Sequence, residues 1–201
     1  MLTLLDGTSA WPAYPVDHVA DHIDFYSFAS QKSLGCPPGL TVVSHSPDAV
    51  KAIELAPVRS NFMNFKTYRK FAPKSETAFT PAVSIIYSLR IALDMLKKEG
   101  QSAFIARQSE MAEHVRSRLM KMGFSLVTEE GFESSTVTAF FCSKNKEINQ
   151  FLQSDHGVKL GGGHADWAET TLRFCNMGDL DMVKIDAGLD ALQAVKSKLG
   201  V

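Results

Sequence analysis

The sequence predicts an α/β protein, and three observations support this class. Short apolar runs separated by turn residues fill the first 45 positions, which is typical of strands in an α/β sheet. Two long stretches with helical spacing follow between positions 81 and 122. The remainder alternates short apolar strands with helices. This alternation predicts a small α+β unit, which the long helices join to the first part of the chain.

Three strands are expected in the first part of the chain, over residues 2–5, 24–29 and 40–45. The second (DFYSFA) is rich in aromatic residues and the third (LTVVSH) in β-branched residues, and both types favour strands. Because the runs are almost continuously apolar, we expect the strands to be covered on both faces. Three strands alone would leave sheet edges that need partners.

A helix is expected from Pro47, because Ser46 is a good N-cap residue and proline suits the first helical position. The following stretch over 59–74 (RSNFMNFKTYRKFAPK) has no clear period. We interpret it as an extended loop.

The strongest helical pattern covers 81–99, with Thr80 as the expected N-cap and Gly100 placed to end the helix. A second helix is expected over 102–122, ended by Gly123. The pattern then changes, and we place a domain boundary there. Residues 1–122 are expected to form one domain with its connecting helices, and residues 123–201 a smaller one.

The expected small domain begins with short strands and ends with a long helix. Its elements are strands over 125–128 and 136–141, a helix near 146–154, a glycine-rich turn over 161–163, a strand over 171–176 and a helix over 179–199.

The composition narrows the classes of function. Hydrophobic residues make up 45% and charged residues 21%, which indicates a folded globular chain. A net charge of −1 gives no attraction to nucleic acid or to an anionic membrane. No apolar run approaches the ~18 residues of a membrane span. Cys36, Cys142 and Cys175 form no zinc or CxxC pattern. We therefore expect a cytoplasmic protein in a reducing compartment.

A carboxylate and an amine follow two of the predicted strands. Asp6 comes directly after the first strand, and Lys32 follows the second. Ligands of open α/β sheets bind outside the carboxyl ends of the strands, so the two groups share a crevice if their strands are neighbours. A desolvated lysine there can attack a carbonyl group. On spacing alone, a surface lysine and a turn aspartate are the alternative interpretation.

Four segments in series carry a family resemblance: LLDGTS at 4–9, SQKSLG with PPGL at 30–40, TPAVS at 80–84 and TLRF at 171–174. Together they resemble the class V pyridoxal-phosphate (PLP) aminotransferases, most closely the alanine–glyoxylate/serine–pyruvate branch. The resemblance spans nearly the whole chain in the right order. It implies the C-terminal part of a fold-type I PLP-transferase large domain, followed by a small α+β C-terminal domain.

The resemblance implies a role for each matching residue in the first part. Lys32 would form the covalent link to PLP and later move the α-proton, and Asp6 would keep the pyridine nitrogen protonated. Thr8, beside Asp6, belongs to the implied cofactor-binding set. Gln31 would hydrogen-bond the cofactor phosphate. Thr80 would contact the phosphate bound to the neighbouring subunit of a homodimer, since a helix start favours an anion.

Arg173 would bind the α-carboxylate of the substrate with its guanidinium fork. Without the resemblance, it reads as a strand-edge arginine on a solvated face. The sequence also departs from the family in one place. Thr77 occupies a position where the family often has a tyrosine, so this part of the phosphate site differs.

Three other motifs are interpreted without a functional role. His18 and His22 are spaced like metal ligands on a helix, but no third ligand accompanies them, so we expect surface residues and no metal site. The GGGH segment at 161–164 lacks the Lys-Ser/Thr of a P-loop and is read as a turn. Cysteine desulfurase chemistry is disfavoured because Cys142 and Cys175 lie within apolar strand runs.

Full-length members of the family are longer than this chain. Their part ahead of the aspartate strand supplies a phosphate-holding helix start, an aromatic ring that stacks on PLP and much of the sheet.

From the resemblance, we expect transamination between a small amino acid (alanine or serine) and a 2-oxo acid (glyoxylate or pyruvate). A partial chain would do this as a homodimer or with an N-terminal half. The alternative is a non-catalytic remnant acting as a binding or dimerisation module, although Asp6, Lys32 and Arg173 are all present.

Overall fold

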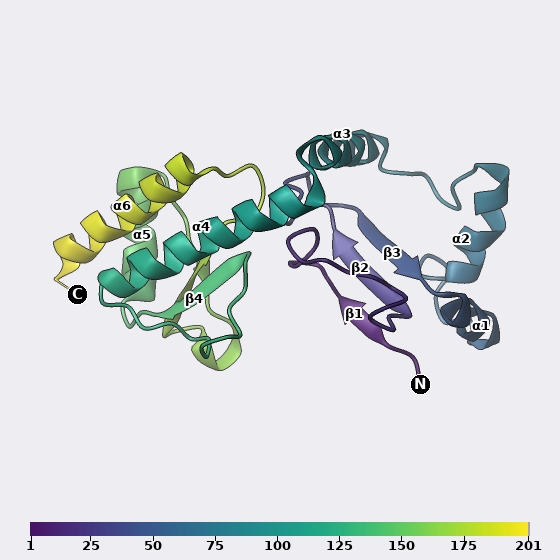
Figure 1. Ribbon diagram of the computed structural model, residues 1–201, viewed down its shortest axis with the longest axis horizontal. Helices are drawn as coiled ribbons and strands as arrows, with labels where there is room; N and C mark the ends of the chain where they lie inside the picture. The colour runs from purple at the N-terminus through teal and green to yellow at the C-terminus, as the bar shows by residue number, and fades with distance from the viewer. Residues whose placement is uncertain (201) are drawn as a thin grey trace. The chain divides into compact units, whose positions relative to one another are not determined.

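The computed structural model describes residues 1–200, which divide into two compact units, Met1–Met95 and Leu96 onward (Figure 1). Each unit is described by itself. Both contain helices and a three-stranded sheet, so the α/β class is confirmed. The domain boundary at 122/123 stays a prediction.

The first unit is built on a sheet in the order β1-β2-β3. Strand β1 (Leu4–Asp6) runs parallel to β2 (Phe25–Ala29), and β3 (Thr41–His45) runs antiparallel to β2. All three expected strands are present, and Figure 1 shows their arrows side by side. Because β1 and β2 are parallel neighbours, the segments that follow them leave the sheet at the same end.

The expectation that these strands are covered on both faces is wrong for β1 and β3. Every residue of β1 is exposed, and β3 has no buried residue. The central strand β2 is the best covered, with Tyr26 and Ala29 buried. The loop between β1 and β2 covers one face, where the Trp11 ring stacks on Phe28 with 4.1 Å between ring centres.

Helix α1 (Pro47–Leu55) starts as expected. The Ser46 hydroxyl oxygen accepts a hydrogen bond from the Ala49 N–H at 3.0 Å, which satisfies one of the unpaired donors of the first turn. The predicted N-cap is therefore confirmed.

The extended loop expected over 59–74 is wrong in its second half. Helix α2 (Phe65–Phe71) and a short 3-10 helix, η1 (Ala72–Lys74), lie there. The Asn64 side chain caps α2 by accepting from the Lys66 N–H at 3.1 Å. The helix has only seven residues and none of them is buried, so its helical spacing is too short to stand out in the sequence.

Helix α3 (Val83–Glu99) begins two residues later than expected, and Thr80 is outside it. The N–H groups of Ile85 and Ile86 both donate to the Ala82 carbonyl oxygen, so the helical hydrogen bonds start there. The expected N-cap at Thr80 is therefore wrong.

Helix α4 (Gln101–Lys121) matches the expected helix within one residue at each end. Gly100 separates it from α3 with a φ of 88°, and Gly123 follows it with a φ of 86°. Both backbone conformations favour glycine, which explains why these residues mark the helix ends.

The second unit contains an antiparallel sheet in the order β4-β6-β5. Its strands are β4 (Val137–Phe141), β6 (Thr171–Cys175) and β5 (Gly161–Gly162). The first two confirm expected strands. The glycine-rich turn is wrong, because β5 pairs with β6. The strand expected over 125–128 is also wrong, since this segment forms a single bridge between Leu126 and Phe140.

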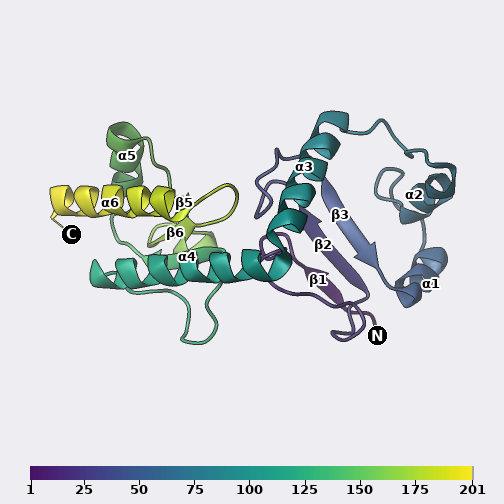
Figure 2. The same cartoon turned by 45° about the horizontal axis from the view of Figure 1, so that its top comes forward.

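Helices α4, α5 (Asn145–His156) and α6 (Met182–Leu199) surround a continuous hydrophobic core. Figures 1 and 2 show α4 and α6 running alongside each other. The helices expected near 146–154 and 179–199 are confirmed, with α6 beginning after Asp181, its N-cap. The fully buried side chains of this unit include Phe140, Ile148, Leu152, Leu172, Leu189 and Leu192.

Candidate active site

Asp6 ends strand β1, and the turn that follows holds its carboxylate. The Oδ1 atom accepts a hydrogen bond from the Thr8 N–H at 2.8 Å. Hydrogen bonds from the Thr8 side chain and backbone lower the pKa of Asp6, so this exposed carboxylate is ionised at neutral pH. Because a carboxylate has about four acceptor positions, it can still receive a further donor.

The glycine of this turn lies against Tyr26, a contact that the sequence analysis missed. A Cβ on Gly7 would overlap the hydroxyl group and ring of Tyr26. The Gly7 N–H also donates to the Ser27 carbonyl oxygen at 2.8 Å. The Tyr26 hydroxyl is buried without a hydrogen-bond partner, and its burial, with the nearby Asp6 charge, raises the pKa of Tyr26. The Asp-Gly turn directly after a strand was the available signal.

Lys32 lies in a turn shortly after β2 and is half-buried. The Lys32 carbonyl oxygen accepts from the Gly35 N–H at 2.9 Å. The loop is anchored by Ser30, whose hydroxyl donates to the Pro37 carbonyl at 2.8 Å and whose N–H donates to the Leu40 carbonyl at 3.0 Å. Among residues 1–200, no hydrogen-bond or ion-pair partner engages the Lys32 ammonium, so its amine is free for other chemistry.

The structure places Asp6, Thr8, Gln31 and Lys32 at one end of the sheet. This follows from the parallel pairing of β1 and β2, in which Asp6 is opposite Ser27. Gln31 is exposed, and so is Thr80, in the segment before α3. These residues all belong to the first unit.

A hollow of about 430 Å³ adjoins the carboxylate of Asp6 on one face of this sheet. Asp6 is its single charged lining residue, and the others are Leu4, Leu5, Phe25, Ser27, Val43 and Phe65. The hollow is therefore an apolar surface with one anionic edge.

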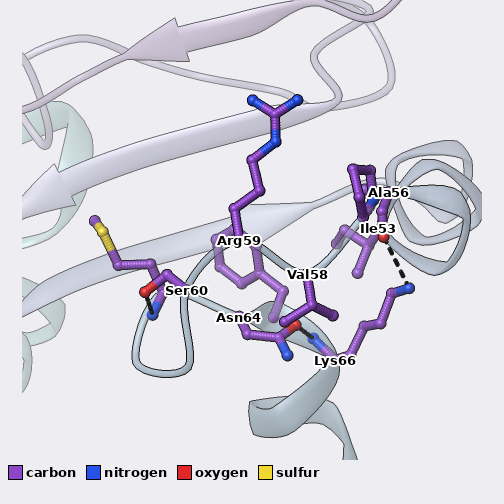
Figure 3. Close-up of a pocket in the computed structure, with 10 residues that line it drawn as sticks. Ile53, Ala56, Val58, Arg59, Ser60, Asn64 and Lys66 are labelled. Carbon is purple, nitrogen blue, oxygen red and sulfur yellow. Dashed lines mark hydrogen bonds between the residues drawn. The ribbon is translucent and has the colours of Figure 1, made fainter.

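A second hollow in this unit, of about 260 Å³, lies around the connection between α1 and α2 (Figure 3). The Lys66 ammonium donates to the carbonyl oxygens of Glu54 and Ala56 at 2.7 and 3.0 Å, where the last carbonyls of α1 lack partners. Figure 3 shows the Arg59 side chain extending away from Lys66. None of the predicted site residues lines this hollow.

Arg173 is the central residue of β6 in the second unit and is half-buried. Its Nε–H donates to the Gly162 carbonyl oxygen at 2.7 Å. No other hydrogen bond or ion pair holds the guanidinium within the described part of the chain, so both Nη groups can receive a carboxylate. A hollow of about 400 Å³ beside it is also lined by Lys159 and Lys184.

His18, one of the two histidines spaced like metal ligands, has hydrogen-bond partners within the chain. His18 Nδ1 lies 2.9 Å from the Ile23 carbonyl oxygen, and His18 Nε2 lies 2.6 Å from the Ser44 hydroxyl. Over residues 1–200, no cluster of three or more His, Cys, Asp or Glu side chains could hold a metal ion. None of the helices described there is long and apolar enough to cross a membrane.

The comparisons with known proteins place the chain in a family. The sequence model described as Aminotransferase class-V matches residues 1–180, and the chain belongs to this family.

Individual relatives and a solved structure match nearly the whole chain. The chain is 28% identical to the small subunit of a soluble hydrogenase from a Synechococcus species, over 99% of this chain and 52% of that protein. It is 27% identical to a serine–glyoxylate aminotransferase from Arabidopsis thaliana, over 99% of this chain and 51% of that enzyme. The solved structure of pyridoxamine–pyruvate aminotransferase from Mesorhizobium loti superimposes with a TM-score of 0.92 at 25% identity, over 100% of this chain and 54% of that one. The chain therefore spans about half the length of these relatives and has the fold-type I aminotransferase fold over that half.

Proposed function

We propose that this chain takes part in PLP-dependent transamination between a small amino acid, such as alanine or serine, and a 2-oxo acid, such as glyoxylate or pyruvate. One observation carries the proposal. An ionised carboxylate (Asp6) and an unpaired amine (Lys32) follow adjacent parallel strands at the same end of a sheet. Family membership and the serine–glyoxylate relative support it.

The residues at this end of the sheet fit PLP. Asp6 offers an ionised carboxylate to the pyridine N–H, and Lys32 offers an amine without a competing partner. Thr8 and Gln31 lie beside these two residues and would hold the cofactor with them. Bound PLP supplies an electron sink for the substrate carbanion.

The side chains would then have separate tasks. Asp6 would hold the proton on the ring nitrogen of the bound cofactor, because its lowered pKa leaves the carboxylate ionised at neutral pH. The Lys32 amine would hold the cofactor when it is bound, and its Nζ atom would move the proton at the substrate Cα. Arg173 holds the substrate carboxylate with its two Nη groups.

The apolar surface of the first unit supports the proposal that this unit binds a partner. Within residues 1–200, 17 of the 22 exposed large hydrophobic side chains belong to this unit. Apolar patches of this kind mark surfaces that other protein covers. We propose a homodimer, in which Thr80 contacts the phosphate bound to the other subunit, or pairing with an N-terminal half. The three free thiols favour a reducing, cytoplasmic location.

The test is covalent trapping at Lys32. The chain is mixed with PLP, reduced with borohydride and digested, and the labelled peptide is identified by mass spectrometry. We expect the label on Lys32, weak for the chain alone and stronger with the N-terminal half of a related aminotransferase added. Lys32→Ala should remove the label, and Lys66→Ala, whose lysine caps α1, should keep it. Label spread equally over surface lysines, with the N-terminal half present, would overturn the proposal and favour a non-catalytic module.

A further inference from the structure

Arg173 lies across a strand that consists of two glycines. Gly161 of β5 is directly opposite Arg173 in the antiparallel register. The Arg173 Nε–H reaches past it to the Gly162 carbonyl oxygen at 2.7 Å. A Cβ built on Gly161 would lie 3.4 Å from Nε and 3.5 Å from both Cβ and Nη2 of Arg173. The arginine side chain therefore runs directly over the bare backbone of Gly161.

The neighbour of Arg173 on the other side is also small. Ala139 of β4 is opposite Arg173 in the register of β4 and β6. Directly opposite residues lie roughly 5 Å apart on the same face of a sheet. Arg173 is therefore flanked by a methyl group on one strand and by a hydrogen atom on the other, so neither neighbour covers the guanidinium.

We propose that Gly161 is a positioning residue for the carboxylate site of Arg173. Because glycine has no side chain, space remains over the backbone of residue 161, and the Arg173 side chain lies in this space. The Gly162 carbonyl oxygen holds the guanidinium there by accepting a hydrogen bond from Nε–H. Both Nη groups then remain for a carboxylate, the anion whose geometry the guanidinium fork matches. The inference rests on the proposed function, in which Arg173 binds the carboxylate of an amino or 2-oxo acid.

The larger the side chain at position 161, the more it should displace the Arg173 guanidinium. An alanine Cβ would sit at ordinary contact distance from Arg173, so Gly161→Ala should change little. Valine adds two methyl groups beyond that Cβ, where the guanidinium now lies. Valine also favours strands, so Gly161→Val should remain folded. Gly162→Val is the matched control, because a Cβ there would meet nothing within 4 Å and the carbonyl is kept.

The experiment measures the Arg173 Nε–H by nitrogen-15 NMR on the full chain, with pyruvate titrated as the probe. The signal is identified by its loss in Arg173→Lys. We expect slow exchange of this N–H with water in the native chain, in Gly161→Ala and in Gly162→Val. In Gly161→Val the protection should be lost and pyruvate affinity should fall about tenfold, as expected for losing one hydrogen bond to a charged group. The circular dichroism of the native fold should persist.

The outcomes separate this inference from the proposed function. Unchanged N–H protection and pyruvate affinity in Gly161→Val would overturn the role of Gly161. Equal losses in Gly161→Val and Gly162→Val would overturn it too, because they would indicate general disruption of β5. A third outcome is that only Gly161→Val loses protection of the Arg173 Nε–H, while the native chain itself does not bind pyruvate. This outcome would support the positioning role of Gly161 and contradict the carboxylate role of Arg173 in the proposed function.

Discussion

The two units of the chain bury their hydrophobic residues very differently. The second unit has one continuous core contributed by α4, α5, α6 and the sheet, with Leu152, Leu189 and Leu192 fully buried. In the first unit, the part of helix α3 that belongs to it, residues 83–95, has no buried residue, and β1 is exposed throughout. The second unit therefore buries most of its own large apolar side chains, whereas the first leaves many of them exposed.

The largest expected effect compares one substitution in both units. Leu189→Ala in the second unit removes a fully buried side chain and should lower the free energy of unfolding by about 3 kcal/mol. Leu55→Ala in the first unit removes a side chain that is 87% exposed, and its effect should stay within about 0.5 kcal/mol. Urea denaturation followed by circular dichroism measures both. Similar losses of unfolding free energy at the two positions would contradict the difference in packing between the two units.

A smaller effect is expected at the tightly packed contact between Gly7 and Tyr26, beside the candidate site. Gly7→Ala forces a methyl group into Tyr26 and should cost about 2 kcal/mol, a typical value for overpacking. Adding Tyr26→Ala should remove much of this cost, because the two residues interact directly. The four unfolding free energies of this double-mutant cycle give the coupling. Additive effects would show that Gly7 is not constrained by Tyr26.

The smallest effect depends on pH and concerns Asp24. Hydrogen bonds from the Ser46 hydroxyl and from the Thr3 N–H lower the pKa of Asp24 from 3.8. The ionised form is thus favoured by folding, and its stabilisation is present above pH 3.8 and is lost as the pH falls through the lowered pKa. Asp24→Asn should lower the urea midpoint of the first unit at pH 7, and the difference from native should shrink below pH 3.8.

The control for this prediction is Asp94→Asn in α3. Asp94 is exposed, and its side chain has no hydrogen-bond partner among residues 1–200. Its replacement should leave the midpoint unchanged across the same pH range. A difference in urea midpoint between native and Asp24→Asn that stays constant at every pH would contradict the prediction. It would show that the charge of the Asp24 carboxylate does not stabilise the first unit.

Much of the fold is predictable from the sequence, and the exceptions share a physical cause. The start of α1 was predictable because Ser46 and Pro47 signal it locally. Helix α2 was not, because its seven residues are too few for a helical period to be recognised. The strand at Gly161 was hidden because glycine has low strand propensity, and its pairing with β6 decides the structure.

The candidate site divides in the same way. Asp6 and Lys32 were predictable as residues that follow strands, and the parallel pairing of those strands is a finding of the structure. The fit of Gly7 against Tyr26 and the path of Arg173 over Gly161 were not predictable. Both depend on a close approach between residues far apart in the sequence, which no local pattern encodes.

Strand β1 has only three residues, yet it is fastened at both ends. At its start, Thr3 donates to the Asp24 carboxylate at 2.9 Å and accepts from the Phe25 N–H at 3.0 Å. At its end, the Gly7 N–H donates to Ser27. A slip of one residue would turn every side chain of the strand to the opposite face, Asp6 included. Residues outside the candidate site therefore determine which way the Asp6 carboxylate faces. A substitution at position 24 that shifts the register would turn this carboxylate to the other face of the sheet while the chain stays folded.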